Sequence, residues 1–106
     1  MEVQYLKEDK LLLLKITEEL DHHVVEKLRR KADYEIERYI PRKVILDFNQ
    51  VSFMDSAGIG LILGRYKNVS ILGGKLEVVN VSQQVTKILN MSGVSKLIDI
   101  NKEECA

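Results

Sequence analysis

The chain contains very little cysteine, proline or aromatic side chain, and neither sign of charge is in excess. Its 106 residues include one cysteine, one proline, no tryptophan and 6% aromatic residues. Cys105 has no second thiol for an intrachain disulfide, so we expect an exposed thiol without a redox or catalytic role. Sixteen basic and sixteen acidic residues cancel to zero formal charge. This balance gives no support for direct binding to nucleic acid or to an anionic membrane.

Long hydrophobic runs are also missing. No apolar stretch approaches the ~20 residues that cross a bilayer, and residues 1–4 do not begin a basic-then-apolar secretion signal. We therefore expect a cytoplasmic protein without a membrane span. The length is sufficient to bury a core without disulfides. Because no linker, repeat or low-complexity tract divides the sequence, we expect a single domain over residues 1–106.

Hydrophobic periodicity and turn residues divide the chain into seven elements. The predicted strands cover residues 3–7, 10–16, 44–48 and 75–80. The predicted helices cover residues 21–40, 56–69 and 82–92. Asp21 and Ser82 are the expected N-caps, Pro41 ends the first helix, and Gly93 suits the left-handed position after the third. Residues 97–100 are compatible with a short strand or a helical turn.

The order strand, strand, helix, strand, helix, strand, helix predicts an α/β fold. It indicates a mixed, mostly parallel sheet with an antiparallel N-terminal edge and helices packed against it. Residues 44–48 form a near-continuous apolar run, which is typical of a central strand covered by helices on both faces.

The second predicted helix is expected to pack on the sheet through four side chains: Ile59, Ile62, Leu63 and Tyr66. Gly60 and Gly64 lie four residues apart on one face of this helix. We expect these two small residues to let the helix backbone lie close to the sheet.

Asp55 and Ser56 place a carboxylate beside a hydroxyl where the third strand meets the second helix. A helix start leaves several N–H groups without intrahelical partners. Ser56 is therefore predicted either to cap the helix or, when phosphorylated, to hold its phosphate near those donors. Both roles require Ser56 to lie near the surface. Ser52, by contrast, is expected to be a hydrogen-bonding serine at the end of the strand.

Three segments carry a resemblance to a known family. They are DFNQVSFMDSAGIGLILGRYK at residues 47–67, ELDHH at residues 19–23 and MSG at residues 91–93. Together they resemble bacterial anti-sigma factor antagonists, the single-domain STAS proteins, and more specifically the branch that acts on the sporulation sigma factor F. The first segment is similar to the phospho-acceptor segment of that family, so the resemblance implies a STAS fold.

The resemblance also implies a partner switch. In the family, the hydroxyl directly after the motif aspartate accepts phosphate from an anti-sigma factor that is also a serine kinase, and Ser56 matches that position. The unphosphorylated protein would bind the anti-sigma factor and release the sigma factor; phosphorylation would end binding until a phosphatase restores it. The implied partner-binding residues are Asp21, Asp55, Ser56, Ala57 and Gly58. The resemblance implies no metal or cofactor.

At two positions the chain departs from the family pattern on which these implied roles rest. Ala57 replaces a commoner second serine and leaves one hydroxyl at the turn. Glu18 replaces the glycine usual before Glu-Leu-Asp. Because glutamate resists backbone turns that glycine allows, we expect the contact surface beside the hairpin to differ from that of the relatives. Asp55 has two open interpretations: it positions Ser56 or the partner's magnesium-bound nucleotide, or it stabilises the turn. For Asp21, helix capping is the simpler role.

Two other functions are considered beside the switch. One is a STAS scaffold or nucleotide-sensing module in another regulatory complex. The other is a small nucleotide-using or hydrolytic enzyme built on Asp55 and Ser56. Against an enzyme, the glycines after Ser56 have the wrong spacing for a dinucleotide fingerprint, and no nucleophile elbow surrounds that serine. His22 and His23 do not complete a metal shell. We therefore predict a regulatory binding module and not an enzyme.

Overall fold

The computed structural model describes residues 1–102, and Cys105 lies outside the described residues. The elements in chain order are β1 (Glu2–Leu6), β2 (Leu11–Lys15), α1 (His22–Tyr39), β3 (Lys43–Asp47), α2 (Ser56–Ile71), β4 (Lys75–Val81), α3 (Gln83–Ser92), the 3-10 turn η1 (Val94–Lys96) and β5 (Asp99–Lys102). The predicted order of strands and helices is confirmed. The tail adds both of the elements considered for it, first a helical turn and then a fifth strand.

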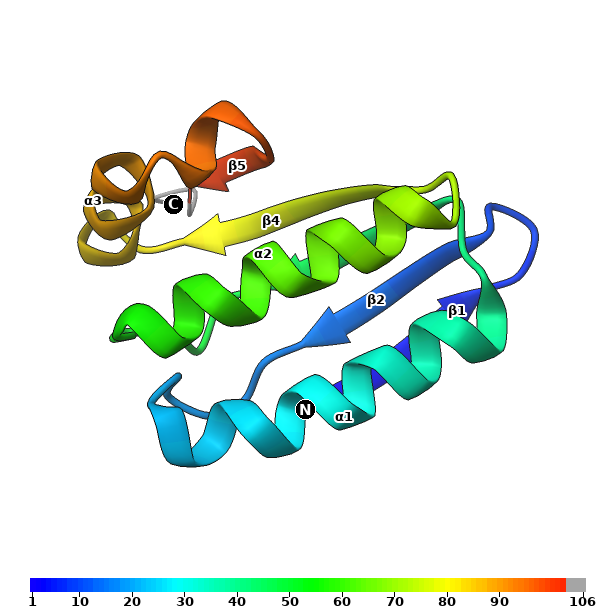
Figure 1. Ribbon diagram of the computed structural model, residues 1–106, viewed down its shortest axis with the longest axis horizontal. Helices are drawn as coiled ribbons and strands as arrows, with labels where there is room; N and C mark the ends of the chain where they lie inside the picture. Colours follow the sequence, from blue (N-terminus) through cyan, green and yellow to red (C-terminus); the bar gives the residue numbers. More distant parts are fainter. Residues whose placement is uncertain (103–106) are drawn as a thin grey trace.

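The strands form one sheet in the order β1-β2-β3-β4-β5 (Figure 1). β1 pairs antiparallel with β2, and the other three neighbouring pairs are parallel. The predicted mostly parallel sheet with an antiparallel N-terminal edge is therefore confirmed. β3 is central, as its apolar sequence predicted.

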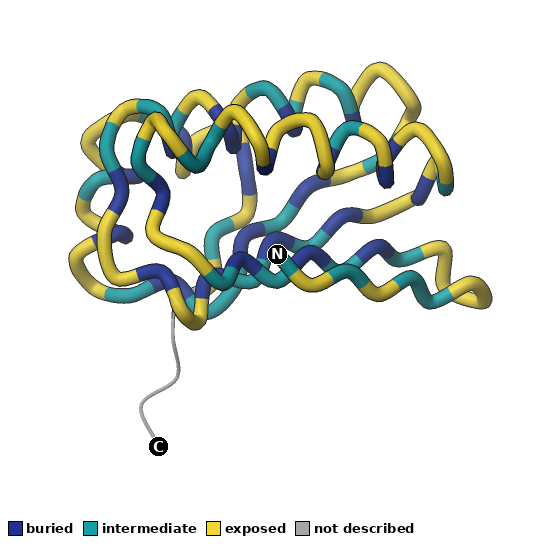
Figure 2. The backbone as a smooth tube through the Cα atoms, turned by 90° about the horizontal axis from the view of Figure 1, so that it is seen from below, coloured by how far each residue is buried: buried dark blue, intermediate teal, exposed yellow. Residues whose placement is uncertain are grey.

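The helices α1 and α2 cover the same face of the sheet. Each crossover advances by one strand in the same direction, and right-handed crossovers of this kind place their helices on one side. Figure 2 shows both helices above the sheet. The prediction that β3 is covered on both faces is wrong: Val44 and Leu46 are buried, whereas Ile45 is only half-buried. Ile45 lines a shallow groove on the other face together with Leu13 and Val79.

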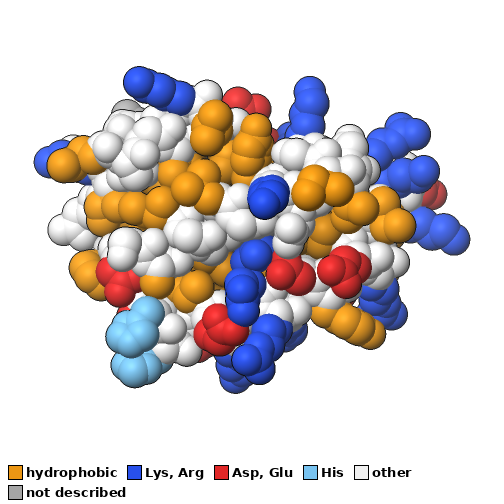
Figure 3. Space-filling view, viewed as in Figure 1, with side chains coloured by type: hydrophobic (Ala, Val, Ile, Leu, Met, Phe, Trp, Pro, Cys, Tyr) orange, Lys and Arg blue, Asp and Glu red, His pale blue; other side chains and the backbone are white. Residues whose placement is uncertain are grey.

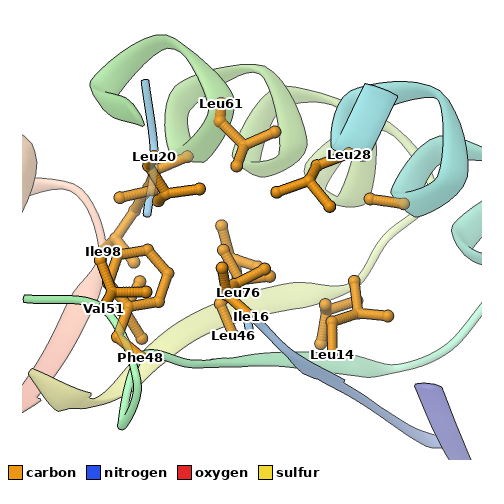
Figure 4. Close-up of a cluster of buried hydrophobic side chains, with 14 of the residues drawn as sticks. Leu14, Ile16, Leu20, Leu28, Leu46, Phe48, Val51, Leu61, Leu76 and Ile98 are labelled. Carbon is orange, nitrogen blue, oxygen red and sulfur yellow. The ribbon is translucent and has the colours of Figure 1, made fainter. Parts of the chain in front are cut away.

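The hydrophobic core fills the layer between the sheet and these two helices (Figure 4). From the strands and the segments that follow them, Leu14, Leu46 and Phe48 point into it. From the helical side, Leu28 and Leu61 meet them, and each of these five side chains is no more than 3% exposed. This continuous layer fixes the positions at which the two helices begin.

The ends of α1 and α3 follow the predicted signals. Asp21 caps α1, and the Ser82 hydroxyl accepts a hydrogen bond from the Val85 N–H at 3.2 Å at the start of α3. Gly93 has a φ of 84°, the left-handed conformation expected after α3. α1 ends at Tyr39, and its C-cap Ile40, which also adopts positive φ, lies directly before Pro41.

Three of the four predicted packing positions of α2 are confirmed, because Ile62 is buried and Ile59 and Tyr66 are half-buried against the core, whereas Leu63 is not. Leu63 is 37% exposed, and the residue buried in its place is Arg65, at 4% exposure. Gly60 and Gly64 have no atoms within 4 Å of an added Cβ, so their predicted close approach to the sheet is wrong. The helix is apolar around much of its circumference, so periodicity did not exclude Leu63 from the buried face. The close approach occurs instead at Gly58.

Candidate functional site

Three loops meet at one edge of the sheet. Because β2, β3 and β4 are parallel, their carboxyl ends lie together, and each leads into a helix (Figure 1). The helix caps Asp21, Asp55 and Ser82 all occupy this edge. In open α/β sheets the carboxyl edge is where ligands bind. Two of its loops carry the residues selected from the sequence: residues 16–21, the β2–α1 loop, and residues 48–55, the acceptor loop.

Ser56 is the first residue of α2 and its side chain is exposed. The N-cap is the preceding residue, Asp55, whose carboxylate accepts a hydrogen bond from the Ala57 N–H at 2.8 Å. The prediction that Ser56 lies near the surface is confirmed, and the capping alternative for its hydroxyl is wrong. For Asp55, the turn-stabilising interpretation matches the observed hydrogen bond.

Residues 55–58, the acceptor turn, rest directly on the core. Asp55 and Ala57 are half-buried, and Gly58 is buried. A Cβ added to Gly58 would lie 2.9 Å from Met54 Cβ and 3.3 Å from Leu20 Cβ. Gly58 thus lies beneath the exposed Ser56 and lets the first turn of α2 sit against both loops.

The β2–α1 loop runs beside the acceptor loop. Leu20 and Met54 form an isolated parallel bridge. The Leu20 N–H donates to the Phe53 carbonyl at 3.4 Å, and the Asp55 N–H donates to the Leu20 carbonyl at 3.3 Å. These contacts bring Asp21, the residue after Leu20, next to the turn that carries Ser56.

Asp21 performs its simpler expected role. Its carboxylate accepts hydrogen bonds from the N–H groups of His23 at 2.9 Å and Val24 at 3.0 Å. Of the residues proposed from the sequence to bind a partner, the structure thus brings together Asp21 and the 55–58 segment, and it leaves Ser56 as the exposed one.

The sequence analysis gave no role to Glu19, which links the two loops. Its carboxylate accepts two hydrogen bonds from Ser52, one from the N–H at 2.9 Å and one from the hydroxyl at 2.6 Å. These hydrogen bonds lower the pKa of Glu19 below its usual value. The hydrogen bonding predicted for Ser52 is confirmed, but its predicted place at the end of a strand is wrong, because β3 ends at Asp47 and Ser52 lies within the acceptor loop. Its partner is 33 residues away in the sequence, so no local pattern identified it.

The surface around this edge mixes apolar side chains with the acidic residues of the two loops. Phe53 is 56% exposed, and Figure 3 shows hydrophobic side chains over α2 and the two histidines at the start of α1. The rings of His22 and His23 lie 4.1 Å apart. Across residues 1–102, no group of three or more His, Cys, Asp or Glu side chains is placed to hold a metal ion. Nor is any helix in that range long and apolar enough to cross a membrane.

The substitution of glycine by Glu18 introduces no backbone strain. Glu18 does not have a positive φ, so a side chain is accommodated without penalty. Its carboxylate lies 4.0 Å from the N-terminal amine. The departure from the usual glycine therefore adds a negative charge beside the hairpin without requiring a left-handed backbone.

Comparison with known proteins identifies the family. A family model for the STAS domain matches residues 2–104. The protein named anti-sigma F factor antagonist from Paenibacillus polymyxa is 37% identical over 94 residues, which are 89% of this chain and 80% of that protein. The protein named anti-sigma-B factor antagonist from Bacillus subtilis is 31% identical over 86 residues, 81% of this chain and 77% of that protein.

Solved structures give the same result. The anti-sigma factor antagonist SpoIIAA in its unphosphorylated form matches with a TM-score of 0.81 and 30% identity, over 96% of this chain and 88% of that one. The phosphorylated form of SpoIIAA, described as a Bacillus cell fate determinant, matches with a TM-score of 0.72 and 29% identity, over 96% of this chain and 91% of that one. With the family model matching nearly its whole length, the chain belongs to the STAS domain family.

Proposed function

We propose that this chain is an anti-sigma factor antagonist that is switched off by phosphorylation of Ser56. The observation that carries the proposal is the exposed Ser56 side chain at the first position of α2, where Asp55 and not Ser56 caps the helix. The names of the relatives support the same function. That SpoIIAA is known in unphosphorylated and phosphorylated forms supports regulation by phosphate.

In this function the chain is a binding module and not an enzyme. The unphosphorylated form binds an anti-sigma factor. This binding frees the sigma factor that the anti-sigma factor had held. The anti-sigma factor is also the serine kinase that transfers phosphate from ATP to Ser56. A phosphoprotein phosphatase hydrolyses the phosphoserine and so restores the unphosphorylated form. The binding surface consists of Asp21, Asp55, Ser56 and Ala57, with Gly58 supporting it from below. We further propose that residues 1–106 act as one domain, and the regulation of a sigma factor places this function in the cytoplasm.

The charge added by phosphorylation is large enough to work as a switch. A phosphoserine carries roughly −1.5 to −2 charge at neutral pH. Two unit charges ~4 Å apart interact by about 4 kcal/mol at an effective dielectric constant of ~20. Against a partner carboxylate or an apolar patch, the added charge opposes binding. Because each 1.4 kcal/mol corresponds to about tenfold in affinity, a penalty of several kcal/mol removes about a thousandfold of binding.

The same charge does not oppose folding. A negative group in the first turn of a helix is stabilised by about 0.3–2 kcal/mol through the helix dipole. Ser56 occupies the first position of α2, so its phosphate gains this interaction within the free protein. Phosphorylation is thus expected to weaken the complex while preserving the fold.

Phosphate transfer in vitro tests the proposal. The chain is incubated with ATP and the anti-sigma kinase encoded at the neighbouring locus, and the product is analysed by intact mass and phosphosite mapping. We expect one phosphate, on Ser56, and none in Ser56→Ala. Ser70→Ala is the matched control, because Ser70 is an exposed serine near the other end of α2.

Two outcomes would contradict the proposal. Absence of phosphate transfer, with intact binding to a different partner, favours the scaffold or nucleotide-sensing alternative. Nucleotide turnover by the purified chain alone, lost in Ser56→Ala, would assign an enzyme.

A further inference from the structure

One residue of the β2–α1 loop holds one residue of the acceptor loop by two hydrogen bonds. Glu19 Oε1 accepts the Ser52 N–H at 2.9 Å, and Glu19 Oε2 accepts the Ser52 hydroxyl at 2.6 Å. Both acceptor oxygens belong to one carboxylate, so the pair fixes the direction as well as the position of Ser52. A hydrogen bond to an ionised carboxylate is shorter and about twice as strong as one between neutral groups.

The remaining polar contacts between the two loops are longer. The backbone hydrogen bonds from Leu20 to Phe53 and from Asp55 to Leu20 measure 3.4 and 3.3 Å, beyond the usual 2.7–3.2 Å range of such bonds. The Glu19–Ser52 pair is thus the strongest polar link between the β2–α1 loop and the acceptor loop. Ser52 lies four residues before Ser56 and directly before the exposed Phe53.

We propose that Glu19 is a positioning residue that, through Ser52, holds the acceptor loop in the conformation that the partner binds and phosphorylates. This inference rests on the proposed function for its partner readouts. Glu19 does not itself touch the phosphate. It acts on the loop that leads from β3 to Ser56, and it keeps that loop aligned with Asp21 on the neighbouring loop.

The inference predicts a specific kinetic signature. When the link is lost, only a fraction of molecules hold the acceptor loop in the binding conformation, and the apparent Kd rises by the inverse of that fraction. Once the loop is bound, Ser56 lies in the same place, so kcat is unchanged. The loss of one or two charge-assisted hydrogen bonds at the surface corresponds to a rise of about three- to tenfold in KM and in partner Kd.

Four variants test this signature in the kinase assay. Ser52→Ala removes the hydroxyl and Glu19→Ala removes the carboxylate, and both should raise KM for phosphorylation of Ser56 while leaving kcat unchanged. Ser52→Thr keeps a hydroxyl and should behave as the wild type. Glu8→Ala is the control for the loss of an exposed acid, because Glu8 lies in the β1–β2 turn at the opposite edge of the sheet. An unchanged KM in Ser52→Ala, or a fall in kcat instead, overturns the inference.

Two NMR measurements test the link without any partner. The Ser52 amide shift should follow the titration of Glu19, with a pKa below the usual glutamate value, and this response should vanish in Glu19→Gln. Glu18, Asp21 and Asp55, the other carboxylates of the two loops, are present in both proteins, so a response lost in Glu19→Gln belongs to Glu19. In Ser52→Ala, the Asp55 amide should exchange with solvent faster than in the wild type.

The outcomes for the two proposals are separable. If the kinase transfers no phosphate to the wild type, the proposed function fails, while the titration and the exchange rate still decide whether Glu19 orders the acceptor loop. If the wild type is phosphorylated but the Ser52 amide titrates identically in Glu19→Gln, or exchange at Asp55 is unchanged in Ser52→Ala, the positioning role is contradicted and the switch at Ser56 stands.

Discussion

Gly58 is the residue at which the acceptor turn, the β2–α1 loop and α2 come into contact. An added Cβ would meet Met54 Cβ at 2.9 Å and Met54 Sδ at 3.0 Å. Met54 is 1% exposed and Leu20 is fully buried, so neither side chain can move into solvent. Gly60, two residues later, is exposed and has no atoms within 4 Å of an added Cβ. The two glycines therefore have opposite structural roles.

Substituting these glycines by alanine should change stability in opposite directions. We expect Gly58→Ala to lower the free energy of unfolding by about 1–3 kcal/mol, because the extra methyl overpacks the core beneath the turn. Gly60→Ala should raise it by up to ~1 kcal/mol, because alanine is the better helix former. Urea unfolding followed by circular dichroism measures both. Equal effects of the two substitutions would contradict the close approach at Gly58.

At the residue scale, the position of the acceptor turn was predictable from the sequence, whereas the residue that caps α2 was not. Asp21 and Ser82 were identifiable as caps because each precedes a periodic segment. At the acceptor turn, however, two adjacent residues, Asp55 and Ser56, are both good caps. Only the backbone of Asp55, extended at φ −103° and ψ −167°, shows which of them precedes the helix and which begins it.

The elements α1 and α2 are joined by a partly buried ion pair. Arg65 Nε on α2 lies 2.7 Å from Asp33 Oδ1 on α1, and Asn68 Nδ2 donates to the same oxygen at 2.8 Å. Arg65 is 4% exposed, and its Nε and Nη1 lack a hydrogen bond of good geometry. Burial lowers the pKa of Arg65, and Asp33 opposes that change. The negative charge of Asp33 therefore offsets the cost of burying the positive charge of Arg65.

Removing one partner of this pair should therefore cost more than replacing the arginine. Asp33→Ala leaves a buried charge without its carboxylate, and we expect a loss of about 2–4 kcal/mol, somewhat reduced because Asp33 itself is partly exposed. Arg65→Met replaces the charge by an apolar side chain of similar length and should change stability by only about 1 kcal/mol. Thermal unfolding of the two variants compares them. A larger loss in Arg65→Met would show that the ion pair itself stabilises the helix contact.

At the element scale, the helices and strands were predictable from the sequence, and so were three of the four packing positions of α2, but not the exposure of Leu63. α1 has clearly separated apolar and charged positions, and Leu28, Ala32 and Ile36, which recur at helical spacing along it, are buried. α2 carries apolar residues on several sides, so the sequence pattern allowed Leu63 to be placed on the buried side of the helix. An arginine is rarely buried, which is why Arg65 was not considered for the core.

For the whole molecule, the direction of the crossovers determines which surfaces are available. Five strands in sequential order place α1 and α2 on one face and leave Leu13, Ile45 and Val79 only half-buried on the other (Figure 2). The strand order is a property of the complete chain and is not contained in the periodicity of any segment. The same order makes β2 and β3 neighbours, and this places Glu19 beside Ser52. The half-buried face of the sheet and the contact between Glu19 and Ser52 therefore could not be predicted from local sequence patterns.

The central claim for the whole molecule is that a phosphate on Ser56 and the bound anti-sigma factor exclude one another. The most direct measurement is the affinity of that partner, by calorimetry, for four proteins: the unphosphorylated wild type, the wild type phosphorylated on Ser56, Ser56→Asp and Ser70→Asp. Ser70→Asp controls for added charge elsewhere on α2 and should bind as the unphosphorylated wild type does.

We predict that Ser56→Asp binds less tightly and that phosphorylation weakens binding by about a thousandfold. Equal affinities of the phosphorylated and unphosphorylated proteins, measured with the fold intact in both, would contradict the account.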